Sequence, residues 1–379
     1  MERIAKSRSP RFTVALQFGL VGLACHGAAP AHAVEVHGRW TGDFAAVVDG
    51  GLRREERHFG LVELALDHAF PIAQREVRLY VAGQHVYGGG FSEDSVGDLQ
   101  AVSNADADPG TRLLEAWLDV QFTDAMSVRF GRYDFNSEFD VIDAGGLFLQ
   151  SSHGIGADIA QTGAAGPSIF PRTALALRLH YDFGGGRAVR GVALDLEADP
   201  DGDYGDVPFF EGPMFALEYE FAPDATRWTA GAWCFTRSRA SLLEPEHRDR
   251  EYGAYASVQR KISGPWLGYA RVGVANPDVS RLGSYLGGGV VHEGGVLASH
   301  DDAIGISIAH ARNGDPYRRA MRDEGTATTA AETAFELTWR VPLGEHVVLQ
   351  PDVQYVLDPD TDPAIDNALV VMLRIEALF

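Results

Sequence analysis

The chain has 379 residues, 45% of them hydrophobic, and a formal net charge of −21 at pH 7. Such an acidic chain is not expected to bind nucleic acid, because phosphate binding requires a basic surface. Beyond residue 33, no uninterrupted apolar run approaches the roughly 20 residues that a membrane-spanning helix needs, which excludes a helical membrane protein.

The first 33 residues have the pattern of a signal peptide for the general secretory pathway. Four basic residues precede an apolar run over residues 12–25, and residues 31–33 form a small-x-small cleavage site. Cleavage after Ala33 would leave 346 residues with a net charge of −24, because four basic residues and one acidic residue are removed. The alternative to cleavage after Ala33 is that Cys25 is a lipidated cysteine. We interpret residues 34–379 as one domain, with Cys234 as its only cysteine and no internal disulfide.

Apolar and polar side chains alternate in several segments, which predicts strands with one apolar and one polar face. Within residues 113–122, one face carries Leu114, Leu118, Val120 and Phe122, and the other carries Glu115, Trp117, Asp119 and Gln121. The same alternation marks residues 172–182, 214–221, 332–341 and 347–356. At the C-terminus, one face of residues 369–379 is apolar as far as Phe379, whereas a soluble protein usually ends in a frayed, polar terminus.

These strands predict an all-β, transmembrane antiparallel β-barrel. A soluble sandwich or propeller also has alternating strands, but it would not place Glu332, Glu336 and Arg340 on one face and leave the apolar face to water. A closed barrel can satisfy its backbone hydrogen bonds in lipid. Sixteen strands would leave about 21 to 22 residues per strand and connection, enough for the roughly 9 to 11 residues of a tilted spanning strand. Eighteen strands would also fit.

The connections between the predicted strands differ in length. A short turn at residues 342–345 is typical of the tight end of a barrel, and the long acidic segment 197–212 is typical of its outer loops. Residues 199–206 lack the spacing of an EF-hand, so a solvated loop is favoured over a calcium site. The histidines are scattered, and neither a metal nor a cofactor is expected.

Four blocks of sequence carry a family resemblance, and the third is the most specific. They are "GGGFSEDSVGDLQAVSNADA" (88–107), "RLLEAWLDVQF" (112–122), "VRFGRYDFNSEFDVIDAGGLFLQSSHGIG" (128–156) and "VVLQPDVQYVLDPDTDPAIDNALVVMLRIEALF" (347–379). In this order they resemble the carbohydrate-selective porins of Gram-negative outer membranes, the OprB-like family. The start departs from the family pattern, because "TGDFAAVVDGGLR" stands where members usually carry a tryptophan-diglycine element.

The resemblance implies a passive outer-membrane channel for small hydrophilic solutes, with sugars as its solutes. The other implied partners are the lipid bilayer, lipopolysaccharide, the barrel assembly machinery, which would recognise terminal Phe379, and further copies of the chain. A general or cation-preferring diffusion porin is the alternative that the acidic charge favours. An outer-membrane barrel enzyme is a remote alternative, suggested only by the adjacent Ser151, Ser152 and His153.

A porin selects solutes at a charged constriction in a water-filled lumen. Residues 134–156 are too long for a tight turn and, by analogy with porins, are expected to fold into the lumen; an outer cap packed by its own phenylalanines is the alternative. Sugars call for hydrogen-bond donors, acceptors and an aromatic ring. The candidate pore-lining and sugar-contact residues are Glu115, Trp117, Asp119, Arg129, Tyr133, Asn136, Glu138, Asp143, Arg178 and His180. For each of them, the alternative interpretation is an ordinary lumen residue that contacts water and has no specific role in binding the solute.

Overall fold

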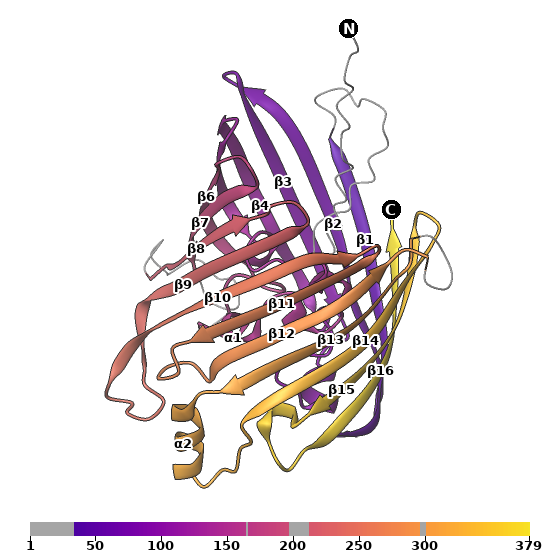
Figure 1. Ribbon diagram of the computed structural model, residues 1–379, viewed down its shortest axis with the longest axis vertical. Coiled ribbons are helices and arrows are strands. Elements are labelled where there is room, and N and C mark those ends of the chain that lie inside the picture. Colours follow the sequence, from indigo (N-terminus) through magenta and orange to yellow (C-terminus); the bar gives the residue numbers. More distant parts are fainter. Residues whose placement is uncertain (1–33, 164–165, 197–211, 296–300) are drawn as a thin grey trace.

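Sixteen antiparallel strands form one closed barrel in the part of the chain that the computed structural model describes, residues 34–163, 166–196, 212–295 and 301–379 (Figure 1). Each strand is hydrogen-bonded to its neighbours in the sequence, and β1 also pairs with β16, which closes the sheet. The predicted antiparallel barrel is therefore confirmed with 16 strands rather than 18. The predicted signal peptide and the acidic segment 199–206 lie outside the described residues.

The strands and helices have the following bounds. The first eight strands are β1 (Glu35–Gly51), β2 (Glu56–Ile72), β3 (Arg75–Tyr87), β4 (Gly110–Thr123), β5 (Met126–Tyr133), β6 (Ala174–Asp182), β7 (Arg187–Asp195) and β8 (Met214–Phe221). The next eight are β9 (Thr226–Ala240), β10 (Arg248–Ser263), β11 (Trp266–Ala275), β12 (Leu282–Glu293), β13 (Ala303–Asn313), β14 (Ala331–Leu343), β15 (Val347–Leu357) and β16 (Asp366–Leu378). The α-helices are α1 (Ala157–Ala160) and α2 (Asp315–Asp323), and five short helical turns of the 3-10 or π type lie in the described loops. No helix in the described ranges is long and apolar enough to cross a membrane.

The two ends of the barrel differ in the length of their connections. At the end where β1 begins and β16 ends, only two residues separate β2 from β3 and β4 from β5. The opposite end carries longer connections, including the one that contains α2 (Figure 1). Phe379 lies at the seam, where its amide donates to the Gly38 oxygen at 3.0 Å and its oxygen accepts from the Gly38 amide at 2.7 Å. The terminal residue is thus held in the sheet.

The predicted faces agree with the exposure of the side chains. On β14, the outward Phe335 and Leu337 are 43% and 51% exposed, whereas the inward Glu332 and Glu336 are 0% and 3% exposed. This is the reverse of a soluble β-protein, because the apolar face points out of the barrel and the charged face points in. The alternation in the sequence therefore identified the lumen face of this strand.

Leu114 is an exception to the predicted faces. The sequence predicts it on the outer face with Leu118, but Leu114 is only 3% exposed and the preceding Leu113 is 48% exposed. The pairing with β3 shifts at this point, since Ala82 pairs with Glu115 and the next residue, Gly83, pairs with Leu113. Leu114 is the extra residue of a β-bulge, which reverses the facing of the residues on one side of it.

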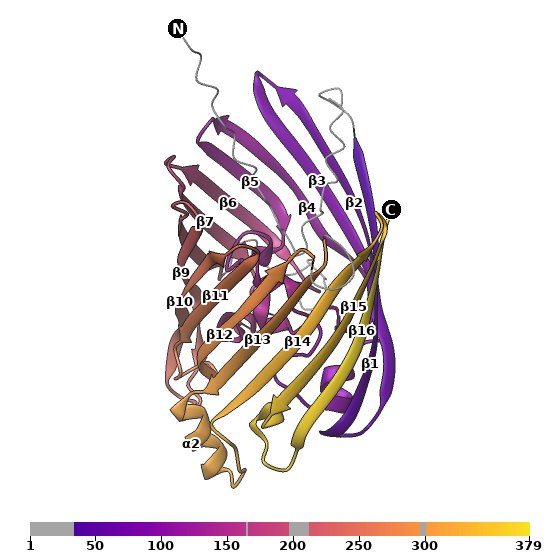
Figure 2. The ribbon, with the colours of Figure 1, turned by 45° about the vertical axis from the view of Figure 1, so that its right-hand side comes forward.

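Two long connections fold back into the barrel and fill part of its lumen (Figure 2). They are the β3–β4 loop, residues 88–109, and the β5–β6 loop, residues 134–173. The phenylalanines Phe135 and Phe139 of the second loop stack on each other at 4.7 Å, and they also pack with the wall residues Trp233 and Tyr255 in one apolar cluster. The inward folding of residues 134–156 is confirmed, whereas sequence reasoning missed the inward folding of the β3–β4 loop.

Candidate functional site

A row of arginines and carboxylates crosses the inner wall from β2 to β9, and the β5–β6 loop adds two more carboxylates to it. We call this set the charged row; its members are Asp67, Arg78, Asp119, Arg129, Glu138, Asp143, Arg178, Arg190, Glu218, Glu220 and Arg227. The strand register produces the alignment, because Arg78 pairs with Asp119, Asp119 with Arg129, and Arg129 with Arg178 across β3 to β6. Inward positions at one level of the barrel therefore carry charges of both signs, with two arginines side by side on β5 and β6.

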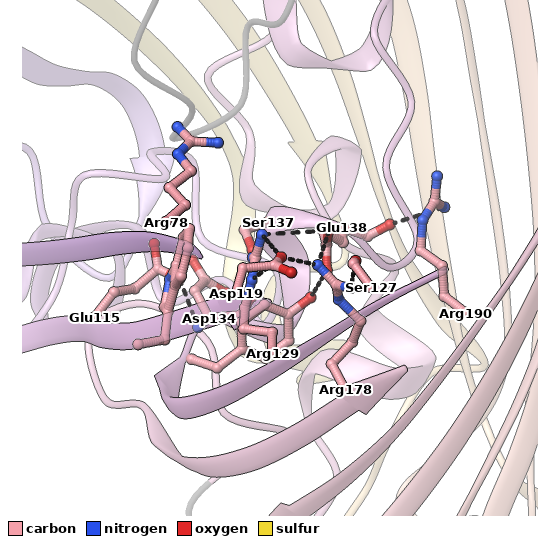
Figure 3. A network of polar contacts seen from close by, with 12 residues as sticks. Arg78, Glu115, Asp119, Ser127, Arg129, Asp134, Ser137, Glu138, Arg178 and Arg190 are labelled. Atoms are coloured by element: carbon pink, nitrogen blue, oxygen red, sulfur yellow. Dashed lines mark hydrogen bonds and ion pairs between the residues drawn. The ribbon is translucent and has the colours of Figure 1, made fainter. Parts of the chain in front are cut away.

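The first half of the charged row is centred on two neighbouring arginines that share two carboxylates (Figure 3). Arg129 and Arg178 reach the same Asp119 oxygen at 3.0 and 2.6 Å. The Glu138 carboxylate comes from the loop and accepts hydrogen bonds from Arg178 at 2.8 and 3.0 Å. The Tyr133 hydroxyl donates to Glu138 as well, at 2.6 Å. These contacts compensate two like charges that the register places side by side.

Electrostatics keeps Glu138 ionised. Burial raises the pKa of its carboxyl, but the guanidinium groups of Arg129 and Arg178 outweigh burial and bring that pKa down to about 2. Because Glu138 belongs to the loop and both arginines belong to the wall, its charge also holds the loop against β5 and β6. The loop therefore contributes a fixed negative charge to the charged row.

The second half of the charged row repeats this arrangement on the next strands. Arg190 lies between Glu218 and Glu220, at 2.7 and 3.0 Å. Arg227 then bonds to Glu220 and to the loop residue Asp143, each at 3.2 Å. Sequence reasoning placed Glu218 and Glu220 on the polar face but did not choose them as candidates, and it missed Arg190 and Arg227. The alternation within residues 214–221 was the signal that could have identified the two glutamates.

Trp117 and Glu115 are packed into the wall beside the charged row. The Trp117 ring contacts the Arg129 guanidinium at 3.7 Å and stacks with Tyr80 at 5.1 Å, so the residue is only 5% exposed. Its indole nitrogen donates to Glu115 at 3.0 Å, and Glu115 also accepts from the Asp134 amide. In this geometry Trp117 supports Arg129, and its two neighbours cover the ring that was expected to stack on a sugar.

The remaining candidates lie at different depths. Tyr133 is fully buried, and its hydroxyl bonds to Glu138. Asn136 donates to the oxygens of Phe139 and Gly154, at 3.0 and 3.1 Å, and so stabilises the fold of the loop. His180 is half-buried and pairs with Arg190 across β6 and β7. The structure brings Asp119, Arg129, Glu138, Arg178 and Asp143 into the charged row, and contact with sugar stays a prediction for all ten candidates.

The charged row offers both donors and acceptors at close spacing. It contains five arginines and six carboxylates, so its charge is nearly balanced although the whole chain is at −21. A neutral, hydroxyl-rich solute can accept hydrogen bonds from guanidinium groups and donate to carboxylates in such a row. In the described ranges, no group of three or more His, Cys, Asp or Glu side chains is placed to hold a metal ion.

A closed barrel with apolar outer strands, a charged inner wall and loops that narrow the lumen is the architecture of a porin, a passive channel of the outer membrane. The family model described as carbohydrate-selective porin, OprB family, matches residues 72–379, which is most of the chain, and the chain belongs to this family. The match begins after the N-terminal segment that departs from the family pattern. The described residues before the match, 34–71, nevertheless supply β1 and most of β2 in the closed sheet.

Solved structures with the same fold come from several bacteria. OprB of Pseudomonas putida, in its high-pH structure, is 18% identical, with a TM-score of 0.79 over 91% of this chain and 94% of that chain. The outer membrane channel DcaP of Acinetobacter baumannii is 12% identical, with a TM-score of 0.63 over 92% and 98%. An anion-selective porin from Comamonas acidovorans is 12% identical, with a TM-score of 0.61 over 92% and 100%. No curated protein sequence matches the chain.

Proposed function

We propose that this porin is a passive channel for sugars and that solutes contact the charged row as they pass. The family membership supports sugars as the solute class. The observation that carries the site is the nearly balanced row of arginines and carboxylates, in which the loop residues Glu138 and Asp143 face the wall. A neutral solute gains little from a net charge, but it gains from donors and acceptors that are already oriented.

Liposome swelling with the purified protein tests this proposal. Sugars, amino acids and organic acids of matched size are offered to the same vesicles, and the swelling rates are compared. A sugar channel should admit the sugars faster than the other solutes, and sugars should reduce the ion current through single channels. Equal rates for all three solute classes would contradict the sugar proposal and leave a general diffusion porin.

A cation-preferring diffusion porin is the second candidate, because the chain as a whole is strongly acidic. The charged row argues against a strong preference for cations, since its arginines and carboxylates nearly cancel. Reversal potentials in a salt gradient separate the two candidates: a nearly balanced constriction gives a small potential, and a cation-preferring one gives a large potential of the corresponding sign.

The location of the protein follows from the same reasoning. A porin belongs in the outer membrane, and we infer export through the general secretory pathway from the pattern of residues 1–33.

The family and the fold are those of a channel rather than an enzyme. The neighbours Ser152 and His153 agree with this, because both are buried and the His153 ring bonds to the Tyr269 hydroxyl at 2.9 Å. Contact with lipopolysaccharide, delivery by the assembly machinery and association with further copies are parts of the proposal.

A further inference from the structure

The two lumen loops are joined to each other inside the barrel. The Asn104 amide of the β3–β4 loop donates to the Leu149 oxygen of the β5–β6 loop at 2.8 Å, and the Ser151 amide donates back to the Ala101 oxygen at 3.0 Å. These bonds resemble a short piece of strand pairing between segments that are far apart in the sequence. The two loops therefore meet the barrel wall as one body.

Strand β14 binds this body through two glutamates that are four residues apart and share the inner face. Glu332 accepts from the Leu99 and Gln100 amides at 2.7 and 3.0 Å. Glu336 accepts from the Leu149 and Gln150 amides at 2.6 and 3.2 Å. Each carboxylate thus satisfies two successive backbone donors of a loop segment that lacks a strand beside it.

Strand β15 supplies the matching donors for the same segments. The Gln350 side chain donates to the Leu147 oxygen, and the Gln354 side chain donates to the Val102 oxygen, each at 2.7 Å. Gln354 is also the direct cross-strand partner of Glu336. The wall therefore presents alternating acceptors and donors to the loops, as a neighbouring strand would present carbonyls and amides.

The adjacent strand β13 lets the loop come close to the wall. Gly305 faces Leu147 and Phe148 of the β5–β6 loop, and a Cβ atom added at Gly305 would lie only 2.8 Å from both side chains. Leu147 is four residues after Asp143, the loop member of the charged row that bonds to Arg227. The loop is therefore fixed by its charges on one side of the lumen and by β13 to β15 on the other.

We propose that Glu332, Glu336, Gln350 and Gln354 form a latch that holds the two loops as one body and so sets the size of the opening beside the charged row. They are positioning residues, because they bind the loops and act on the solute only through the loops. This proposal rests on the proposed function in one respect, namely that the opening is where solutes pass. Release of the latch should widen the opening without changing the charges of the row.

The double variant Glu332→Ala with Glu336→Ala tests the latch. Each substitution removes the acceptor of two amides of the joined loops, and Glu332→Ala also removes the acceptor of the Asp360 amide in the β15–β16 connection. Because the loops stay joined to each other, the two effects should be more than additive. Discrete events of higher conductance should become roughly tenfold more frequent, a factor that corresponds to ~1.4 kcal/mol of lost loop binding. Entry of a trisaccharide should rise relative to that of a monosaccharide, while the reversal potential stays near that of the wild type.

Glu376→Ala is the matched control, because Glu376 also points into the lumen but contacts the wall residue Arg340 at 3.7 Å instead of a loop. A double variant with the conductance events and trisaccharide ratio of this control would overturn the latch. If the double variant does not fold, Glu336→Gln is compared with Glu376→Gln. The first keeps one acceptor oxygen and should show a smaller increase in high-conductance events; indistinguishable behaviour of the two would overturn the proposal.

Hydrogen exchange provides a readout that does not depend on the identity of the solute. The amides of Leu99, Gln100, Leu149 and Gln150 should exchange faster in the double variant than in the wild type and in Glu376→Ala. Unchanged exchange at these amides would overturn the latch. A latch that passes this measurement in a channel that does not prefer sugars would leave the latch standing and remove the sugar proposal.

Discussion

At the scale of single residues, Glu138 shows how the lumen can hold a charge at its buried wall. Its pKa is lowered to about 2, because Arg129 and Arg178 outweigh the effect of burial. A carboxyl whose pKa is lower in the folded state stabilises that state at every pH above its unfolded value. The stabilisation is lost as the pH falls from about 4.5 towards about 2.

The corresponding prediction concerns Glu138→Gln. At pH 7 this variant should be less stable than the wild type by roughly 3 kcal/mol at most, since it loses the charge that both arginines bind. The difference should shrink between pH 4.5 and pH 2, because the wild-type carboxyl becomes protonated there. Urea unfolding of both proteins from lipid vesicles at several pH values measures this difference in stability. A difference that stays constant down to pH 2 would contradict the lowered pKa.

The same substitution at Glu376 is the control for this prediction. Glu376 is a lumen carboxylate of β16 that lies outside the charged row and contacts Arg340 at 3.7 Å. Glu376→Gln therefore removes a lumen charge without removing the shared partner of two arginines. Its loss of stability should be smaller than that of Glu138→Gln, and a larger loss would point to a general effect of lumen charge.

At the scale of the elements, the strands could be predicted because alternation has a period of two, and each strand reports its own faces. The bulge at Leu114 could not be predicted from the alternation, because it depends on the register between β3 and β4. The charged row was predicted in part: Asp119, Arg129 and Arg178 share inward positions, but their alignment is set by the register between strands. The latch was beyond prediction, because Glu336 and Leu149 are 187 residues apart.

The faces of β14 lead to a prediction about lipid contact. Leu337 and Leu343 are both outward and both 51% exposed, but Leu337 lies in mid-strand and Leu343 at the strand end. Leu337→Arg should cost roughly 2 to 4 kcal/mol, whereas Leu343→Arg should cost about 0 to 1 kcal/mol near the interface. Reversible folding into vesicles of defined lipid measures both costs. Equal costs for the two variants would mean that depth in the bilayer does not decide the effect.

At the scale of the whole molecule, the barrel depends on the seam between its first and last strands. β1 and β16 pair along most of their length, and Phe379 and Gly38 exchange backbone hydrogen bonds at one end of the seam. Closure leaves no free sheet edge in lipid, where an unpaired edge would carry unsatisfied backbone groups. Phe379 itself is 68% exposed, so its ring is not needed to fill a core.

The backbone and the ring of Phe379 should therefore have separable roles. Phe379→Ala keeps the two hydrogen bonds to Gly38, and we expect it to refold into lipid vesicles like the wild type. Deletion of Phe379 removes those bonds as well and should refold less completely. In cells, both variants should give less folded, heat-modifiable barrel in the outer membrane, because the assembly machinery is proposed to recognise the ring. Wild-type outer-membrane levels of Phe379→Ala would contradict that recognition, and equal refolding of the deletion would show that the seam closes without this residue.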